Sequence, residues 1–330
     1  MYFFKFTYWV IYKAFYIYFK KKQQVKFGEN LLRKLEQEHN GKFDERTFKK
    51  IIFGYSIQIP AIYDGFLGLY NRKSSQQECT NLLHYFICSS VFDNFFDRQE
   101  LTDKEIYAIT FDSQNFSPKS FEQRIGLAAH LYLLSNINPN EKQEYLTVLK
   151  RAFDVQAASR NQFNSTISNQ EIDWITREKG GCALQLCCYY LDKVNSIEEK
   201  KTWYALGEVI QFTNDLYDIY RDIQNGLETI PNRLENIIEF KSMFLNLINN
   251  LKNEINNITV HSANKLPLKI SLMGIAAFGI IAIEQLEKIA DKNGNLPNLK
   301  TVPRKQLIVD MEKPSMLIKW VNITYKLSKK

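Results

Sequence analysis

The sequence predicts an all-α protein, and three observations carry that prediction. Its 330 residues include only 13 glycines and 8 prolines, so few positions interrupt regular structure. Long stretches rich in leucine, isoleucine, lysine, glutamate and asparagine repeat apolar residues at helical spacing. No stretch alternates apolar and polar residues in the way a half-buried strand does. With 45% hydrophobic residues and no evident linker, the chain is expected to form one large helical domain.

Residues 1–22 differ from residues 23–330. They are rich in aromatic residues, but Lys5 and Lys13 interrupt the apolar run and a lysine triplet ends it. A membrane-spanning helix needs about 20 uninterrupted apolar residues, and a signal peptide carries its charge first. Two interpretations therefore stay open for this segment: a helix that covers the mouth of an apolar pocket, and a helix that lies on a membrane surface.

Capping residues and prolines predict where the later helices begin and end. Thr102 with Glu105 and Ser196 with Glu199 have the spacing of a capping box. Ser117-Pro118 indicates a helix start, and Ile59-Pro60 and Gly180-Gly181 indicate breaks. The other helices are expected at about residues 25–39, 45–59, 61–70, 75–97, 118–134, 139–160, 171–190, 233–258, 266–292 and 313–327. Ser168 with Glu171 caps the one at 171–190. The apolar run 270–283 is too short to span a bilayer and indicates a buried core helix.

Composition excludes several classes of function. The net charge of +7 is spread out, with lysine clusters near the two ends at residues 20–22 and 329–330. It lacks the pattern of a nucleic-acid-binding module and favours anionic small substrates or an acidic membrane surface. The five cysteines lack the spacing of a zinc site, so core packing in a reducing cytoplasm explains them best. The four histidines are scattered and form no catalytic arrangement.

The stretch Gln211–Gly226 carries the strongest chemical signal. Asn214, Asp218 and Asp222 are spaced four apart, so they share one face of a helix. Two carboxylates and an amide oxygen are ligands that Mg²⁺ prefers, and Arg221 adds a donor suited to phosphate oxygens. A solvated, salt-bridged helix face is the alternative. The apolar neighbours of these residues favour the metal-binding interpretation.

A second acidic pair lies about 120 residues earlier in the sequence. Asp93 and Asp97 are four apart near the end of an expected helix and lie among phenylalanines. Two surface carboxylates are the alternative, but these aromatic neighbours would make a costly surface. Two acidic faces on opposing helices could hold Mg²⁺ ions that a diphosphate bridges.

These two segments resemble the metal-binding motifs of class I terpenoid synthases. VFDNFFD resembles the aspartate-rich motif and NDLYDIYRD resembles the second motif, in the order and at the spacing of that family. The first motif has Asn94 where many members have aspartate, and the second has Asp218 and Asp222 in place of Ser/Thr and Glu. The resemblance covers most of the chain from about residue 75 onward. It implies an isoprenoid synthase helical bundle with a central apolar cavity, and family members are often homodimers.

The resemblance also implies a role for each candidate site residue. A cluster of about three Mg²⁺ ions would be held by Asp93, Asp97, Asn214, Asp218 and Asp222. The candidate diphosphate donors are Arg177, Lys179 and Arg221, with the helix break at Gly180 and Gly181 beside them. Aromatic side chains are suited to the wall around a carbocation, and the candidates are Phe92, Phe96, Trp174, Tyr189, Phe212 and Tyr217. For each ring taken singly, ordinary core packing is the alternative.

Three functions follow as hypotheses. The first is a cytoplasmic, Mg²⁺-dependent terpene cyclase, a carbon–oxygen lyase that ionises an allylic prenyl diphosphate of about 15 to 25 carbons. The second is a prenyltransferase that joins two isoprenoid diphosphates, because Asp218 and Asp222 also make a D-x-x-x-D pair like those of squalene and phytoene synthases. The third is a non-catalytic helical protein that binds metal, or a membrane through residues 1–22. The third leaves two matched acidic faces unexplained.

Overall fold

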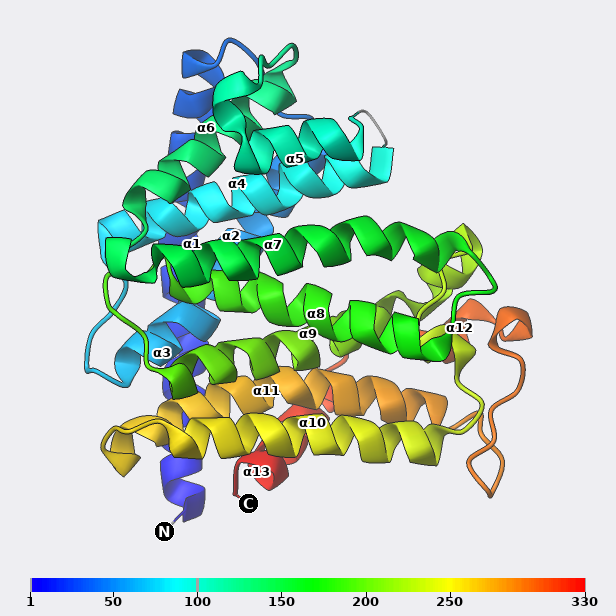
Figure 1. The fold of residues 1–330 in the computed structure, drawn as a ribbon. Helices are drawn as coiled ribbons and strands as arrows, with labels where there is room; N and C mark the ends of the chain where they lie inside the picture. The colour runs from blue at the N-terminus through cyan, green and yellow to red at the C-terminus, as the bar shows by residue number, and fades with distance from the viewer. Residues whose placement is uncertain (1, 99–100, 330) are drawn as a thin grey trace. The chain divides into compact units, whose positions relative to one another are not determined.

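The computed structural model describes residues 2–98 and 101–329, and within these residues every regular element is a helix (Figure 1). The one β-type contact in this described part is an isolated bridge between Asn236 and Asn295. The predicted all-α fold class is therefore confirmed.

The chain forms two compact units. Unit 1 contains residues 2–6, 148–185 and 195–329, and unit 2 contains residues 7–147 and 186–194. The divisions between the units fall inside three continuous helices: α1 (Tyr2–Glu38), α7 (Lys142–Ala158) and α8 (Asn169–Cys188).

Unit 2 is built around α4 (Gln76–Arg98), which packs against three other helices: α2 (Glu45–Gln58), α5 (Asp103–Phe111) and α6 (Phe121–Asn136). The short elements between them are η1 (Ile59–Tyr63), α3 (Asp64–Gly68), η2 (Ser113–Asn115) and η3 (Pro139–Glu141). The inward side chains of α4 are completely or almost completely buried, among them Leu82, Leu83, Ile87, Val91 and Phe95. Because α4 contributes so many core side chains, the acidic pair near its end is held on a rigid element.

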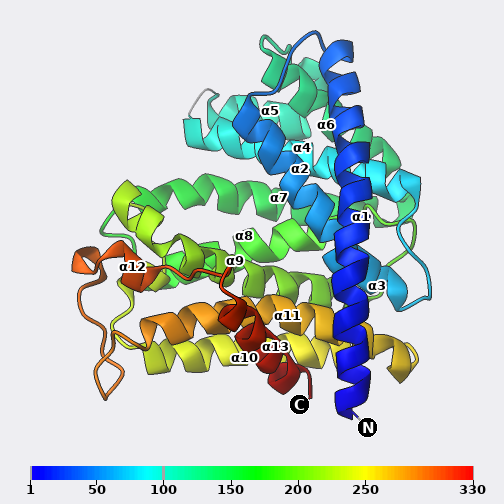
Figure 2. The same cartoon turned by 180° about the vertical axis from the view of Figure 1, so that it is seen from behind.

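Helix α1 continues across residue 22, where the sequence predicted the end of a separate N-terminal segment. Figure 2 shows α1 in blue as an uninterrupted helix, where the sequence predicted an N-terminal segment and a separate helix at 25–39. Gly28 lies within it without ending it. A β-carbon there would lie 2.9 Å from Ile52 Cδ1 and 3.3 Å from Tyr55, so this glycine allows α1 and α2 to approach closely.

Two predicted helix boundaries in unit 2 are wrong in detail. Pro60 does not end the helical path, because α2 continues through the π-helical turn η1 into α3. The helix predicted from Ser117-Pro118 begins instead after Ser120, whose hydroxyl accepts a hydrogen bond from the Gln123 N–H. The capping box of Thr102 and Glu105 is confirmed at the start of α5.

Unit 1 is a bundle in which α9 (Ile197–Asn225), α10 (Ile237–Asn257) and α11 (Ser262–Leu286) pack against one another, with α13 (Pro314–Lys329) against α11. The shorter elements of this unit are η4 (Ser159–Phe163), η5 (Pro231–Arg233), η6 (Leu299–Thr301) and α12 (Arg304–Leu307). By length and composition, α11 is apolar enough to cross a membrane. Most of its apolar side chains are buried within the protein, so it is a core helix, as its sequence predicted.

Candidate functional site

Helix α9 carries the acidic stripe, and both of its ends are fixed. At the start, Ser196 and Glu199 form the predicted capping box. At the end, Gly226 adopts φ +67°, a left-handed conformation that favours glycine, and the chain turns away from the helix there. The intervening 29 residues are continuous helix, so Asn214, Asp218 and Asp222 share a face as predicted.

The three stripe residues become more buried toward the end of α9. Asn214 is exposed, the side chain of Asp218 is 37% exposed, and that of Asp222 is 6% exposed. Burial, and next the charge of Asp218, raise the pKa of the Asp222 carboxyl to about 6, although Arg221 and Lys179 oppose the shift. Burial also raises the pKa of Asp218. Two neighbouring carboxylates are thus held where their negative charge is incompletely compensated.

Arg221 and Lys179 supply positive charge beside the stripe. Arg221 forms a short ion pair with Asp218, and its Nε lies 3.8 Å from a carboxylate oxygen of Asp222. Its side chain is 63% exposed, so these pairs contribute little to stability and the guanidinium remains accessible. Lys179, on α8, lowers the pKa of both Asp222 and Asp215, so its ammonium group lies near α9.

Arg177 is also on α8, but two carboxylates already share its charge. Its Nε donates to Asp173 at 2.7 Å, its Nη1 donates to Glu208 at 3.1 Å, and its guanidinium lies 5.4 Å from the centre of the Phe212 ring. Its side chain is 28% exposed. Of the two donors that the sequence proposed on α8, Arg177 is thus paired with carboxylates, whereas Lys179 acts through its charge on the carboxyls of Asp222 and Asp215.

Asp215 is a buried acid that the sequence analysis did not assign. It is 7% exposed and accepts hydrogen bonds from Gln211 Nε2 at 2.8 Å and Thr176 Oγ1 at 3.4 Å. Burial is the main reason that its pKa rises to about 7. The sequence held only part of the signal: Asp215 lies between the apolar Phe212 and Leu216 and four positions after Gln211, but no local pattern indicates Thr176.

The break predicted at Gly180-Gly181 is wrong, since α8 is continuous from Asn169 to Cys188. The two glycines serve close packing instead. A β-carbon on Gly180 would lie 2.3 Å from the carbonyl oxygen of Gly207, and one on Gly181 would lie 2.3 Å from the Tyr204 ring. Their lack of side chains brings the backbones of α8 and α9 together directly before the acidic stripe.

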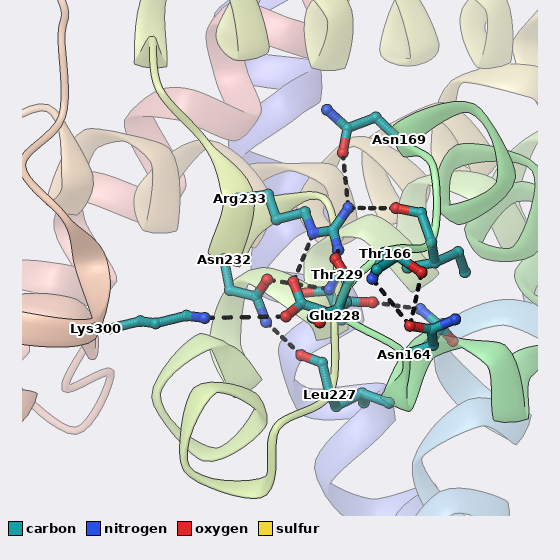
Figure 3. A network of polar contacts seen from close by, with 12 residues as sticks. Asn164, Thr166, Asn169, Leu227, Glu228, Thr229, Asn232, Arg233 and Lys300 are labelled. Atoms are coloured by element: carbon teal, nitrogen blue, oxygen red, sulfur yellow. Dashed lines mark hydrogen bonds and ion pairs between the residues drawn. The ribbon is translucent and has the colours of Figure 1, made fainter.

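A polar network holds the loop that follows α9 (Figure 3). Arg233 donates to Glu228 at 2.5 Å and to the backbone carbonyls of Ile167 at 2.6 Å and Ser165 at 2.8 Å. Asn232 bonds with the backbone of Leu227 and Thr229 in the same loop.

The same loop is also joined backbone to backbone to the segment before α8. The N–H of Glu228 donates to the carbonyl oxygen of Gln162 at 2.7 Å, and the Gln162 side chain donates back to the Glu228 carbonyl at 2.9 Å. The network thus fixes the end of α9 that carries Asp222 against the start of α8.

Asp93 and Asp97 lie in unit 2, on the last turns of α4. Asp93 accepts a hydrogen bond from Lys50 Nζ at 2.9 Å, and Asp97 is exposed. Asn94 donates to Thr47 Oγ1 at 3.1 Å, so it is tied to α2. Within unit 2 these residues form a partly neutralised acidic pair.

The six aromatic candidates have different surroundings within their own units. Phe212 is completely buried and lies 6.4 Å from Phe240 between ring centres. Tyr217 is half-buried and donates to the Phe278 carbonyl at 3.4 Å, and burial raises its pKa to about 12. Trp174 is 46% exposed.

In unit 2, Phe92 is half-buried beside Phe95 and His130, while Phe96 and Tyr189 are buried. Phe96, Tyr189 and Phe212 are thus buried among other side chains of their own units.

The donor atoms of the stripe fit a hard divalent cation. Among residues 2–98 and 101–329, no three His, Cys, Asp or Glu side chains gather closely enough to hold a metal ion by themselves. The α9 stripe offers two carboxylates and one amide oxygen. Mg²⁺ usually binds through one or two carboxylates and completes its shell with waters and substrate phosphates. The uncompensated charge of Asp218 and Asp222 suits such a cation.

Comparison with known proteins adds no assignment to this geometry: no protein-family model matches the chain, and no curated protein matches it either.

Proposed function

We propose that the protein is a Mg²⁺-dependent terpene synthase of the class I type, which ionises an allylic prenyl diphosphate of about 15 to 25 carbons and cyclises the carbocation. The observation that carries the proposal is the α9 stripe, in which Asp218 and Asp222 lie close together with raised pKa values. Lys179 and Arg221 lie beside these acids. This combination suits a substrate that brings metal ions and a diphosphate together.

In this proposal each group beside the stripe has one task. Asn214, Asp218 and Asp222 would hold Mg²⁺ on α9, and Asp93 and Asp97 are candidate metal ligands through the family resemblance alone. Bound Mg²⁺ supplies the positive charge that stabilises the departing diphosphate. Lys179 and Arg221 donate hydrogen bonds to the diphosphate oxygens, and Arg177 helps by holding α8 and α9 in register through Glu208. Apolar and aromatic side chains keep water from the carbocation.

Product analysis tests the proposal directly. The full chain is incubated with Mg²⁺ and, separately, with geranyl, farnesyl, geranylgeranyl and geranylfarnesyl diphosphate, and both released diphosphate and extractable products are measured. A terpene hydrocarbon or alcohol that requires Mg²⁺ supports the proposal. No diphosphate release from any substrate contradicts it.

Variants of the stripe show whether the activity belongs to this site. Asn214→Ala is expected to reduce turnover at least a hundredfold, an estimate of about the size of the loss of one electrostatic group in an active site. Asn225→Ala is the matched control, because Asn225 is also an exposed asparagine on α9. Calorimetric binding of Mg²⁺ with inorganic diphosphate gives a readout that is independent of turnover, and it should weaken in Asn214→Ala alone.

The second candidate is a prenyltransferase that joins two isoprenoid diphosphates. The pair Asp218 and Asp222 favours it, because the two acids alone form a D-x-x-x-D arrangement on α9. A prenyl product longer than either substrate, formed only when two diphosphates are supplied together, would replace the cyclase assignment. A non-catalytic role predicts no diphosphate release with any combination.

A further inference from the structure

One face of α1 exposes a continuous group of apolar side chains. Large side chains are between 38% and 63% exposed along residues 8–19, namely Tyr8, Ile11, Tyr12, Phe15, Tyr18 and Phe19. At 100° per residue, they fall within an arc of about 120° around the helix axis. We call this set the aromatic face of α1. It lies in unit 2, and Phe53 of α2, which is 64% exposed, belongs to the same unit.

The aromatic face is larger than the apolar patches that ordinary monomers expose. Each aromatic side chain has about 200 Å² of surface, so the exposed fractions of the face, with Phe53, correspond to on the order of 750 Å². The largest patch on a typical soluble monomer is about 300–600 Å² and is often functional. A surface of this size indicates a partner.

Every charged residue of α1 before Glu29 is a lysine. Residues 1–28 contain six lysines and no aspartate or glutamate, a net charge of +6 out of the chain's +7. At the end of the face, Lys22 Nζ donates to the Tyr18 hydroxyl at 2.8 Å, and Lys21 Nζ lies 5.4 Å from the centre of the exposed Phe53 ring. Lysines whose stems lie along aromatic rings keep their charge at the border between an apolar and an aqueous phase.

We propose that the aromatic face of α1 binds the surface of an anionic lipid bilayer, with α1 in the headgroup region and its rings directed toward the acyl chains. Tyrosines and phenylalanines beside lysines are the composition of membrane-interface helices. The lysines beside the face, without a single acid before Glu29, match an anionic surface, which contributes about 1 kcal/mol per nearby lysine. Buried Lys13 on the opposite side of α1 makes a spanning orientation unfavourable.

Charge also decides against a second copy of the chain as the partner. A symmetric dimer through this face would bring the same surface of two molecules together, so Lys21 and Lys22 of both copies would meet with no acid from residues 1–28 between them. A lipid surface instead offers negative charge and an apolar phase at once.

Vesicle flotation tests the proposal without any substrate, so its outcome does not depend on the proposed enzyme activity. The full chain is floated with vesicles of phosphatidylcholine alone or with about 30% phosphatidylserine. We expect binding to the anionic vesicles that weakens as NaCl rises from about 0.1 M to about 0.5 M, because screening acts on the lysines. No flotation with anionic vesicles overturns the proposal.

Matched variants show which surface binds. Replacing the exposed Ile11, Phe15 and Phe19 together by glutamine should lower the partition coefficient at least tenfold, about the effect of losing three inserted apolar side chains. The control replaces three equally exposed apolar residues elsewhere, Phe163, Ile197 and Ile238, and should leave binding unchanged. Equal losses in both triple variants would contradict the proposal.

Charge variants and size measurement complete the test. Lys21→Gln with Lys22→Gln should reduce binding to anionic vesicles roughly thirtyfold, whereas the exposed pair Lys292→Gln with Lys305→Gln should not. Light scattering without lipid identifies the alternative partner. A stable dimer that the Ile11, Phe15 and Phe19 variant dissociates, and that vesicles do not disrupt, would assign the face to self-association instead.

Discussion

Gly180 of α8 and Gly207 of α9 face each other with no side chain between them: a β-carbon on Gly207 would lie 2.1 Å from the carbonyl oxygen of Gly180. On each side the atom that an added β-carbon would meet is the carbonyl oxygen of the other glycine. A backbone atom cannot rotate away as a side chain can. The separation of α8 and α9 beside the candidate site is therefore set by two residues that are 27 positions apart in the sequence.

Gly180→Ala should destabilise unit 1. The added methyl group must push two helix backbones apart, and we expect the free energy of unfolding to fall by about 2–3 kcal/mol. Urea denaturation measures the change. Gly68→Ala is the control, because a β-carbon on Gly68 meets no atom within 4 Å. It should stay within about 1 kcal/mol of the parent protein. Equal losses of unfolding free energy in Gly180→Ala and Gly68→Ala would mean that α8 and α9 are not in close contact at Gly180.

Lys13 should make stability depend on pH at the alkaline end. Burial, and next the charge of Lys73, lower the pKa of Lys13 to about 8, while Asp64 opposes the shift. Between about pH 8 and pH 10.5 the unfolded chain therefore binds more protons at this residue than the folded one, and the contribution of Lys13 to stability rises with pH.

Lys13→Met should remove this dependence. At pH 7 the variant should be more stable on the order of 2–3 kcal/mol, because it no longer buries an ammonium group. The measurement is urea denaturation at a series of pH values. Lys26→Met, at an exposed position of the same helix, should leave the profile unchanged. An unchanged profile in Lys13→Met would show that Lys13 titrates as an ordinary solvated lysine.

Arg233 should be important for the loop after α9. Arg233→Met leaves the Glu228 carboxylate, whose side chain is 11% exposed, with Lys300 at 4.0 Å as its remaining ion pair, and it removes donors from two backbone carbonyls. We expect a loss of about 3 kcal/mol in the free energy of unfolding. Adding Glu228→Gln to this variant should recover part of the loss, since the stranded charge is gone. If the stability losses of Arg233→Met and Glu228→Gln simply add in the double variant, then Arg233 and Glu228 are not energetically coupled.

Lys179 should contribute to catalysis more than to stability. If it donates to the diphosphate as proposed, Lys179→Gln should lower kcat/KM about a hundredfold, with the melting temperature nearly unchanged. Lys150→Gln is the control, because Lys150 pairs with Asp154 at 2.5 Å on α7 and lies outside the site. A Lys179 variant with full activity would leave Arg221 as the sole donor beside the stripe.

Local signals predicted a large part of the fold. The capping boxes at Ser196 and Thr102 were found correctly because all their atoms lie within one turn of helix. The shared face of Asn214, Asp218 and Asp222 was equally accessible, since helical geometry alone determines it.

The predictions failed where distant partners decide the outcome. Glycine has a low helix propensity, so Gly180 on its own predicts a helix break. Helix α8 is unbroken there, and the close approach of the Gly207 backbone is the reason that position 180 needs a glycine. Asp215 was not assigned because its environment comes from Thr176 of α8 as well as from α9. The burial of Lys13 also depends on Lys73 and Asp64, which no local pattern indicates.

The two ends of the chain meet in unit 1. The Tyr2 hydroxyl donates to Ser328 Oγ at 2.8 Å, across 326 residues of sequence, and the rings of Phe6 and Tyr325 pack 5.1 Å apart between centres. On the ribosome, the first turn of α1 is made long before α13 exists. Unit 2 has all its residues once position 194 has been synthesised, whereas unit 1 must wait for the last helix. The rings of Tyr2 and Phe6 therefore lack their partners on α13 until that helix has been made.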